Sequence, residues 1–153
     1  LSSKTETAQL SKTMQRADDI HVNTRALVTF KNRETEYFAA PLQSVDRIER
    51  ISSADIEQIG KSRVIQYRGE TLPLFELSDF MNVSPISIKK EQDVIVFKNQ
   101  YRYFGLLVTP PVDTLKANVE LDETAFKQKG IKGSLVINGH TTLLMDSDII
   151  FEE

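Results

Sequence analysis

The chain has 153 residues, a formal net charge of −3 and no cysteine. Its length allows one domain or two small subdomains, and the lack of cysteine excludes a disulfide framework and any cysteine-ligated metal site. No apolar run approaches the ~20 residues of a membrane helix and no signal-peptide pattern opens the chain, so we expect a cytoplasmic protein without direct membrane insertion. The 19 basic and 22 acidic residues are interspersed, which argues against a nucleic-acid partner.

Residues 1–24 are polar and differ in pattern from the rest of the chain. A capping box at Ser3 and Glu6, followed by a thin apolar stripe at helical spacing, allows a short helix, but a linker fits equally well. Because the first residue is Leu1 rather than methionine, we expect a fragment of a longer protein.

The next segment changes to the two-residue period of strands. Residues 26–40 predict a hairpin around a polar loop. The spacing of three between the apolar residues from Val45 to Ile51 fits either a helical turn or a twisted strand. Residues 53–57 are typical of a capped turn.

A second hairpin is predicted within residues 64–80, with its reversal at Arg68-Gly69-Glu70. Gly69 suits the reversal because a residue without Cβ tolerates positive φ. Pro73 cannot donate to a ladder, so its strand should have one free or irregular side. Ser78 is a candidate helix cap.

The polar segment between Met81 and Asp93 predicts a junction, and a third hairpin follows with its reversal at residues 98–100. Pro110-Pro111 should end the second strand of that hairpin, since neither proline has an N–H to donate. The irregularly spaced apolar residues from Val112 to Leu121 then predict one bulged strand.

The last part of the chain contains the clearest hairpin signal. Phe126 could centre one helical turn before it. Asn138-Gly139 then fits both positive-φ positions of a type I′ turn between the apolar segments 135–137 and 142–145.

Two of these patterns occur twice. Residues 69–74 are echoed by residues 139–144, and residues 30–32 by residues 97–99, at offsets between 66 and 70. Internal repetition of this kind indicates related structural units in tandem. We therefore predict an all-β chain whose two units span residues 25–92 and 93–153.

No constellation of catalytic residues is recognisable. His21 and His140 have no metal-ligand spacing, and nucleophile elbows, P-loops and dinucleotide motifs are missing. We therefore expect a non-enzymatic binding module without cofactor or metal, whose edge apolar residues contact partners. The candidates, for which burial in the cores is the alternative, are Ile48, Ile51, Ile56, Ile59, Val112 and Leu115.

The pattern resembles the CheW-like domain of bacterial chemotaxis. The resemblance rests on residues 38–42, on the R-G-x-x-x-P-L segment of residues 68–74, and on residues 103–108 and 133–146, and it covers about residues 26 to 151. It implies two tandem SH3-like five-stranded β-barrels with short helical turns.

The resemblance also implies a function. Members of this family scaffold receptor signalling: one barrel docks on a barrel of a partner domain, and a groove between the barrels holds the cytoplasmic tip of a chemoreceptor. The expected partners are thus a CheW-type adaptor or CheA-type kinase and a chemoreceptor, in arrays at the membrane. By resemblance, Val45, Arg68 and Gly69 are groove candidates. The docking candidates are Ile51, Ile56, Ile59, Val112 and Leu115.

Within the family, the segment from Ser53 to Glu70 is most similar to the C-terminal regulatory domain of the histidine kinase CheA. A free-standing CheW-type adaptor is the alternative, and a small-barrel nucleic-acid-binding module a remote one. Arg47 stands where free adaptors often carry an acidic residue, so Arg68 should find another partner, with Glu49 and Glu70 as candidates.

Overall fold

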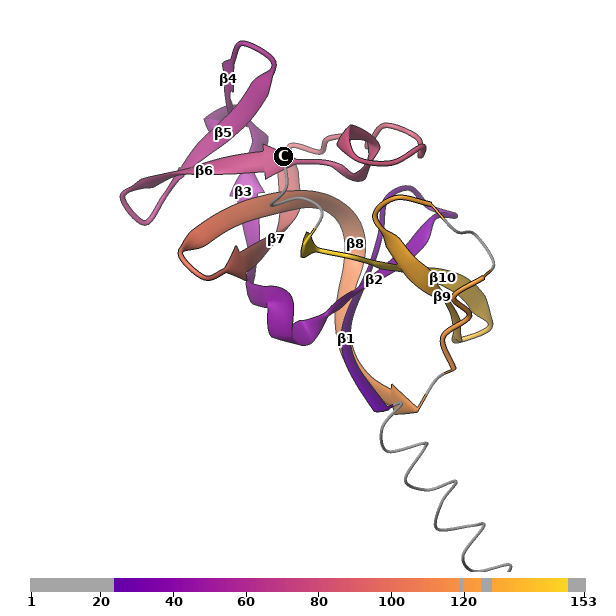
Figure 1. Ribbon diagram of the computed structural model, residues 1–153. Coiled ribbons are helices and arrows are strands. Elements are labelled where there is room, and N and C mark those ends of the chain that lie inside the picture. The colour runs from indigo at the N-terminus through magenta and orange to yellow at the C-terminus, as the bar shows by residue number, and fades with distance from the viewer. Residues whose placement is uncertain (1–23, 119, 125–127, 149–153) are drawn as a thin grey trace, which may run out of the picture.

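The computed structural model describes residues 24–118, 120–124 and 128–148. Its regular structure consists of strands and short 3₁₀ turns (Figure 1). The strands are β1 (Thr24–Lys31), β2 (Tyr37–Pro41), β3 (Val45–Ser52), β4 (Glu57–Ile59), β5 (Ser62–Tyr67), β6 (Glu70–Phe75), β7 (Glu91–Asn99), β8 (Arg102–Asn118), β9 (Ile131–Ile137) and β10 (His140–Met145). The 3₁₀ turns are η1 (Leu42–Ser44), η2 (Ser53–Asp55) and η3 (Leu77–Asp79). Among the described residues, no helix has the length and apolar character that crossing a bilayer requires.

The two hairpins predicted from glycine-containing turns are confirmed. β5 and β6 are joined by Arg68 and Gly69, with φ of 53° and 79°. β9 and β10 are joined by Asn138 and Gly139, with φ of 51° and 79°. Both turns therefore have positive φ at their two central residues, as a type I′ turn requires.

The strands of each predicted tandem unit do not form one barrel by themselves. The β1–β2 hairpin pairs with the second part of β8 and with β10, whereas the β7–β8 hairpin pairs with β3 and β6. Each repeat thus contributes its first hairpin to the strands of the other repeat. Strand pairings thus cross the expected division between residues 92 and 93 in both directions.

Two groups of strands result, and they correspond to the two predicted barrels. The β1 barrel consists of β1, β2, residues 109–118 of β8, β9 and β10. The β5 barrel consists of β3 to β7 and residues 102–108 of β8. Figure 1 shows β8 running from one group of strands to the other.

The expectation that Pro110-Pro111 end a strand is wrong. β8 continues through both prolines and changes partners beside them, since Val108 is opposite Asp93 of β7 and Thr109 is opposite Lys31 of β1. A proline cannot donate to a ladder. The missing donors therefore fall where β8 leaves one neighbour for the other.

Three apolar clusters form the core of the described residues. One lies inside the β5 barrel and one inside the β1 barrel, while the third joins residues of both barrels. In β7, Val94 and Val96 belong to the β5 barrel cluster, whereas Ile95 and Phe97 belong to the shared cluster. Because successive side chains of a strand point to opposite faces, a strand buried on both faces is continuously apolar.

Three segments with ambiguous sequence patterns have defined local structure. The segment from Val45 is strand β3, preceded by η1, and residues 53–57 contain η2. Within the part of the chain that the structure describes, β6 pairs with β8 only at Leu74 and Phe75, so one side of Pro73 is unpaired, as expected. The cap of η3 is Glu76 rather than Ser78.

Some sequence-based expectations concern residues that the structure does not describe. The N-terminal helix or linker falls largely on residues 1–23, and the helical turn was centred on Phe126; both lie outside the described residues. Val119 of the expected bulged strand does so too, and Leu121 packs against the β1 barrel cluster beyond the end of β8.

Candidate functional site

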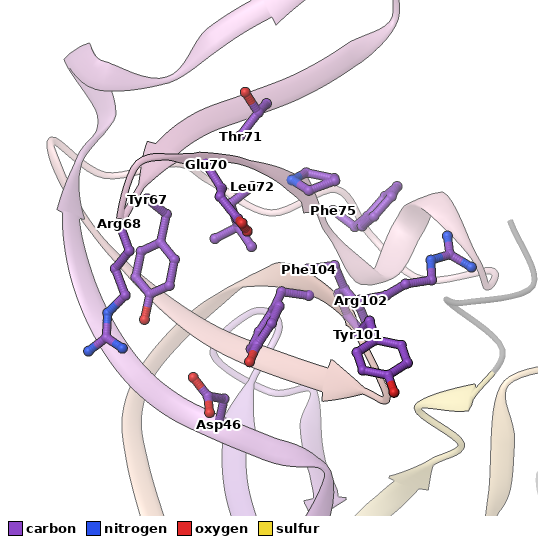
Figure 2. A pocket seen from close by; sticks show the side chains of 12 residues that line it. Asp46, Tyr67, Arg68, Glu70, Thr71, Leu72, Phe75, Tyr101, Arg102 and Phe104 are labelled. Carbon is purple, nitrogen blue, oxygen red and sulfur yellow. The ribbon is translucent and has the colours of Figure 1, made fainter.

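A groove of about 630 Å³ lies between the β5–β6 hairpin and the β7–β8 hairpin (Figure 2). We call it the hairpin groove. It is lined by Asp46, Tyr67, Arg68, Glu70, Thr71, Leu72, Pro73, Phe75, Tyr101, Arg102, Tyr103 and Phe104. All of these residues belong to the β5 barrel or its turns, so this groove lies within one barrel and not between the two.

Packed aromatic side chains form one apolar wall of the hairpin groove. Phe75 and Phe104 meet edge to face, with ring centroids 6.0 Å apart and planes at 72°. Behind them Phe97 stacks on Phe104 at 5.1 Å and is fully buried. Such ring pairs contribute about 0.5–1.5 kcal/mol each beyond the area they bury. The wall is therefore anchored in the shared core.

Tyr67 forms the opposite side together with charged neighbours. Its hydroxyl donates a hydrogen bond to Glu49 Oε1 at 3.4 Å, and the Arg68 guanidinium lies 5.5 Å from its ring centroid. Burial raises the pKa of the Tyr67 hydroxyl, the Arg47 charge opposes this rise, and Glu49 adds to it. Tyr67 is thus held as a neutral hydrogen-bond donor at neutral pH.

The expected pairing of Arg68 with Glu49 or Glu70 is not found among the described residues. Arg47 takes Glu49 instead, at 3.4 Å, and also lies 3.8 Å from Asp46. Arg68 stacks on Tyr67, and Figure 2 shows its guanidinium pointing away from the groove. Arg68 is exposed, and Arg47 rather than Arg68 pairs with Glu49.

A second, smaller groove of about 120 Å³ lies in the β1 barrel. We call it the counterpart groove, because seven of its lining residues correspond by the internal repeat to lining residues of the hairpin groove. The pairs are Asp46 with Asp113, Tyr67 with Ile137, Arg68 with Asn138, Glu70 with His140, Leu72 with Thr142, Tyr103 with Tyr37, and Phe104 with Phe38. Here the imidazole of His140 stacks on the Tyr37 ring, with centroids 4.2 Å apart and planes at 15°.

Of the three groove candidates, one lines the hairpin groove and the other two are sequence neighbours of lining residues. Arg68 lines the hairpin groove, and Gly69 is beside it in the same turn. Val45 packs against the shared core, next to the lining residue Asp46.

The docking candidates do not form one surface. Ile51 and Ile56 are half-buried against the β5 barrel cluster, and Ile59 is exposed to 60% on β4. Val112 packs against the shared cluster and Leu115 against the β1 barrel cluster. Burial in the cores thus accounts for all of these residues except Ile59; their role in partner binding stays a prediction.

Sequence reasoning missed most of the groove's polar and aromatic lining, notably Asp46, Tyr101 and Tyr103. A signal was available, because Val45-Asp46 recurs as Val112-Asp113 at an offset of 67, within the range of the other repeats. His140 is exposed and stacks on Tyr37.

The described residues contain no group of three or more His, Cys, Asp or Glu side chains placed to hold a metal ion. The hairpin groove is lined by aromatic rings, carboxylates and arginines. Such an arrangement suits recognition of a protein segment.

Comparisons with known proteins agree with this fold. A protein-family model described as "CheW-like domain" matches residues 26–153. Among solved structures, the chain is similar to the scaffolding protein TtCheW from Thermoanaerobacter tengcongensis, with a TM-score of 0.66 and 16% sequence identity. That similarity covers 80% of this chain and 89% of the other.

Proposed function

Because the chain belongs to the CheW-like domain family, whose members are non-catalytic scaffold domains of bacterial chemotaxis, we propose that it is the regulatory domain of a CheA-type histidine kinase. In this role it couples chemoreceptors to the kinase through protein contacts alone. One barrel docks on a CheW-type adaptor, and the hairpin groove receives the cytoplasmic tip of a receptor.

The exposed apolar edge of the β5 barrel carries the docking proposal. Among the described residues, β4 pairs only with β5 and ends the strand order on that side. Its residue Ile59 is exposed to 60%, and Ile48 of β3 to 42%. Strand edges with exposed apolar side chains readily accept another protein, and Ile51 and Ile56 anchor this edge to the core.

A coupling domain of this kind must report the state of the receptor to the kinase. It can do so only if its partners bind two states of the assembly with different affinity. Phe104 connects the groove to both barrels, because it lines the hairpin groove and belongs to the shared apolar cluster. A segment bound in the groove would thus contact Phe104, a side chain that packs against residues of both barrels.

Docking is tested by titrating the domain with a CheW-type adaptor in a calorimeter. We expect micromolar affinity, weakened about tenfold or more by Ile59→Asp, because a desolvated apolar anchor dominates small interfaces. Gln58→Glu is the matched control, since it adds the same charge one residue away on the opposite face of β4. Equal binding of Ile59→Asp and the wild type would refute docking through this edge.

Receptor binding is tested with a fragment that contains the signalling tip. Arg68→Ala should weaken binding of this fragment and leave adaptor docking unchanged, because Arg68 lies at the groove and not on β4. If Arg68→Ala affects neither partner, the groove is not the receptor site.

A free-standing adaptor is the second candidate, favoured by the likeness to a scaffolding protein over 89% of that chain. An antibody against the domain separates the two in an immunoblot of cells that produce the protein. A band near the 17.4 kDa of this sequence supports the adaptor, and a much larger one supports the kinase. Either protein would act in the cytoplasm at receptor arrays, where a fluorescent fusion should form clusters.

A further inference from the structure

The two repeat-related grooves differ in what covers one equivalent tyrosine. In the counterpart groove, the Tyr37 ring is covered by the His140 imidazole at 4.2 Å and approached by the Lys31 ammonium, whose Nζ lies 5.1 Å from the ring centroid. This tyrosine thus already holds a planar ring and a cation, both supplied by the chain itself. The stacked pair contributes to the small size of this groove, about 120 Å³.

In the hairpin groove the equivalent position is open. Tyr103 is exposed to 38%, and no aromatic ring stacks on it among the described residues. Glu70 stands where the counterpart has His140, and Lys98, which corresponds to Lys31, does not line this groove. The volume here is about 630 Å³.

The charges near this open ring favour a cation. Asp46 and Glu70 both line the groove with Tyr103. Of the two arginines in the lining, Arg68 lies over Tyr67. Figure 2 shows Arg102 reaching toward the Phe75 side, away from Asp46. The region around Tyr103 therefore has an aromatic face and two carboxylates, Glu70 and Asp46, of which Asp46 also lies 3.8 Å from Arg47.

We propose that the hairpin groove binds an arginine side chain of the partner protein, with its guanidinium on the Tyr103 ring and its charge facing Glu70 and Asp46. Guanidinium combines the flat shape of the His140 imidazole with the positive charge of Lys31, the two groups that the counterpart tyrosine holds. This inference relies on the proposed function only in giving the groove a protein partner.

The side-chain specificity can be tested without any partner. We would titrate ¹⁵N-labelled domain with N-acetyl-arginine amide at constant ionic strength and follow the backbone amides by NMR. Saturable shifts at residues 46, 70 and 103 are expected, with a Kd of about 10–100 mM for so small a probe. N-acetyl-citrulline amide has the same shape without the charge and should bind about fivefold more weakly. No saturable shifts, or equal affinity for both probes, would overturn the proposal.

Three variants identify the groups involved. Tyr103→Leu and Glu70→Gln should each weaken arginine binding severalfold, because one removes the ring and the other a facing charge. Glu70→His introduces the residue that the counterpart groove carries and should abolish binding by covering Tyr103. Glu57→Gln is the control for the charge change, because Glu57 is an exposed carboxylate of the same barrel that does not line the groove. Unchanged binding by both Tyr103→Leu and Glu70→His would refute the assignment.

Failure of this inference can be told apart from failure of the proposed function. Adaptor docking is measured through Ile59→Asp on β4, which does not line the groove. If Ile59→Asp abolishes adaptor docking while the arginine amide fails to bind, the scaffold function stands and only the arginine site is lost. Spectra of each variant verify the fold before titration.

Discussion

The carboxylate of Glu76 accepts a hydrogen bond from the backbone N–H of Ile86 at 2.6 Å, which ties the long segment after β6 to the end of that strand. Glu76 is exposed to only 5% and also lies 3.4 Å from Arg63 Nη2. It caps η3 through a reciprocal pair of bonds with Asp79. One buried carboxylate therefore accepts the Ile86 N–H and pairs with the Arg63 guanidinium.

Glu76→Ala should lower the free energy of unfolding by about 1–3 kcal/mol, because it leaves buried donors without an acceptor. Urea denaturation followed by circular dichroism measures this loss. Glu57→Ala, at an exposed glutamate of the same barrel, is the control and should change stability by less than about 0.5 kcal/mol. Similar losses for both variants would mean that the bonds of Glu76 contribute little.

Gly105 in β8 should not tolerate a methyl group. A Cβ at this position would lie 2.7 Å from Leu74 Cδ2 and 2.8 Å from Val94 Cγ1, both inside the β5 barrel. We expect Gly105→Ala to cost about 1–3 kcal/mol of stability through overpacking.

A double-mutant cycle checks the cause of that loss. Leu74→Val removes part of the clashing side chain, so the double variant Gly105→Ala with Leu74→Val should be more stable than the sum of the two single losses predicts. Strict additivity of the two losses would contradict a steric conflict between Leu74 and the new methyl group.

The two barrels should unfold together. β8 pairs with β7 and β6 in one barrel and with β1 in the other, and the shared apolar cluster contacts both. Leu107→Ala removes a fully buried side chain of the β5 barrel cluster and should cost about 2–5 kcal/mol.

Native-state hydrogen exchange tests this coupling. Although β9 belongs to the other barrel, the amides around Leu135 should lose as much protection in Leu107→Ala as the amides of β5 lose. If β9 keeps its wild-type exchange, the barrels unfold independently.

Tyr67 should make stability fall at high pH. Burial of its hydroxyl, more than the nearby Glu49, raises its pKa in the folded state, and Arg47 opposes the rise. In the unfolded chain, tyrosine ionises near a pKa of about 10. The unfolded state therefore loses its proton first as pH rises. The stability that Tyr67 contributes is fully present below about pH 10 and is lost as pH rises through the higher pKa of the folded state.

Absorbance at 295 nm follows tyrosinate formation in this titration. The difference between the wild type and Tyr67→Phe should report a group that ionises at higher pH than N-acetyl-tyrosine amide. A difference curve that coincides with the free amide would show that the burial of Tyr67 has no effect on its ionisation.

The sequence by itself determined the local structure and the family. Asn138-Gly139 and Arg68-Gly69 predicted their hairpins because the positive φ of a tight turn depends on the turn residues themselves. The repeat and the R-G-x-x-x-P-L segment were likewise readable without coordinates, and they led to two small barrels and a scaffold role.

Tertiary structure alone decided which strands pair and what meets in the groove. Nothing local distinguishes a β1–β2 hairpin that closes its own repeat from one that closes the other, because the choice depends on contacts between distant segments. The same holds for β8, which continues through Pro110-Pro111 since a new partner, β1, is available there. Asp46, Glu70 and Tyr103 come from three separate segments and line one groove only because long-range pairing brings those segments together.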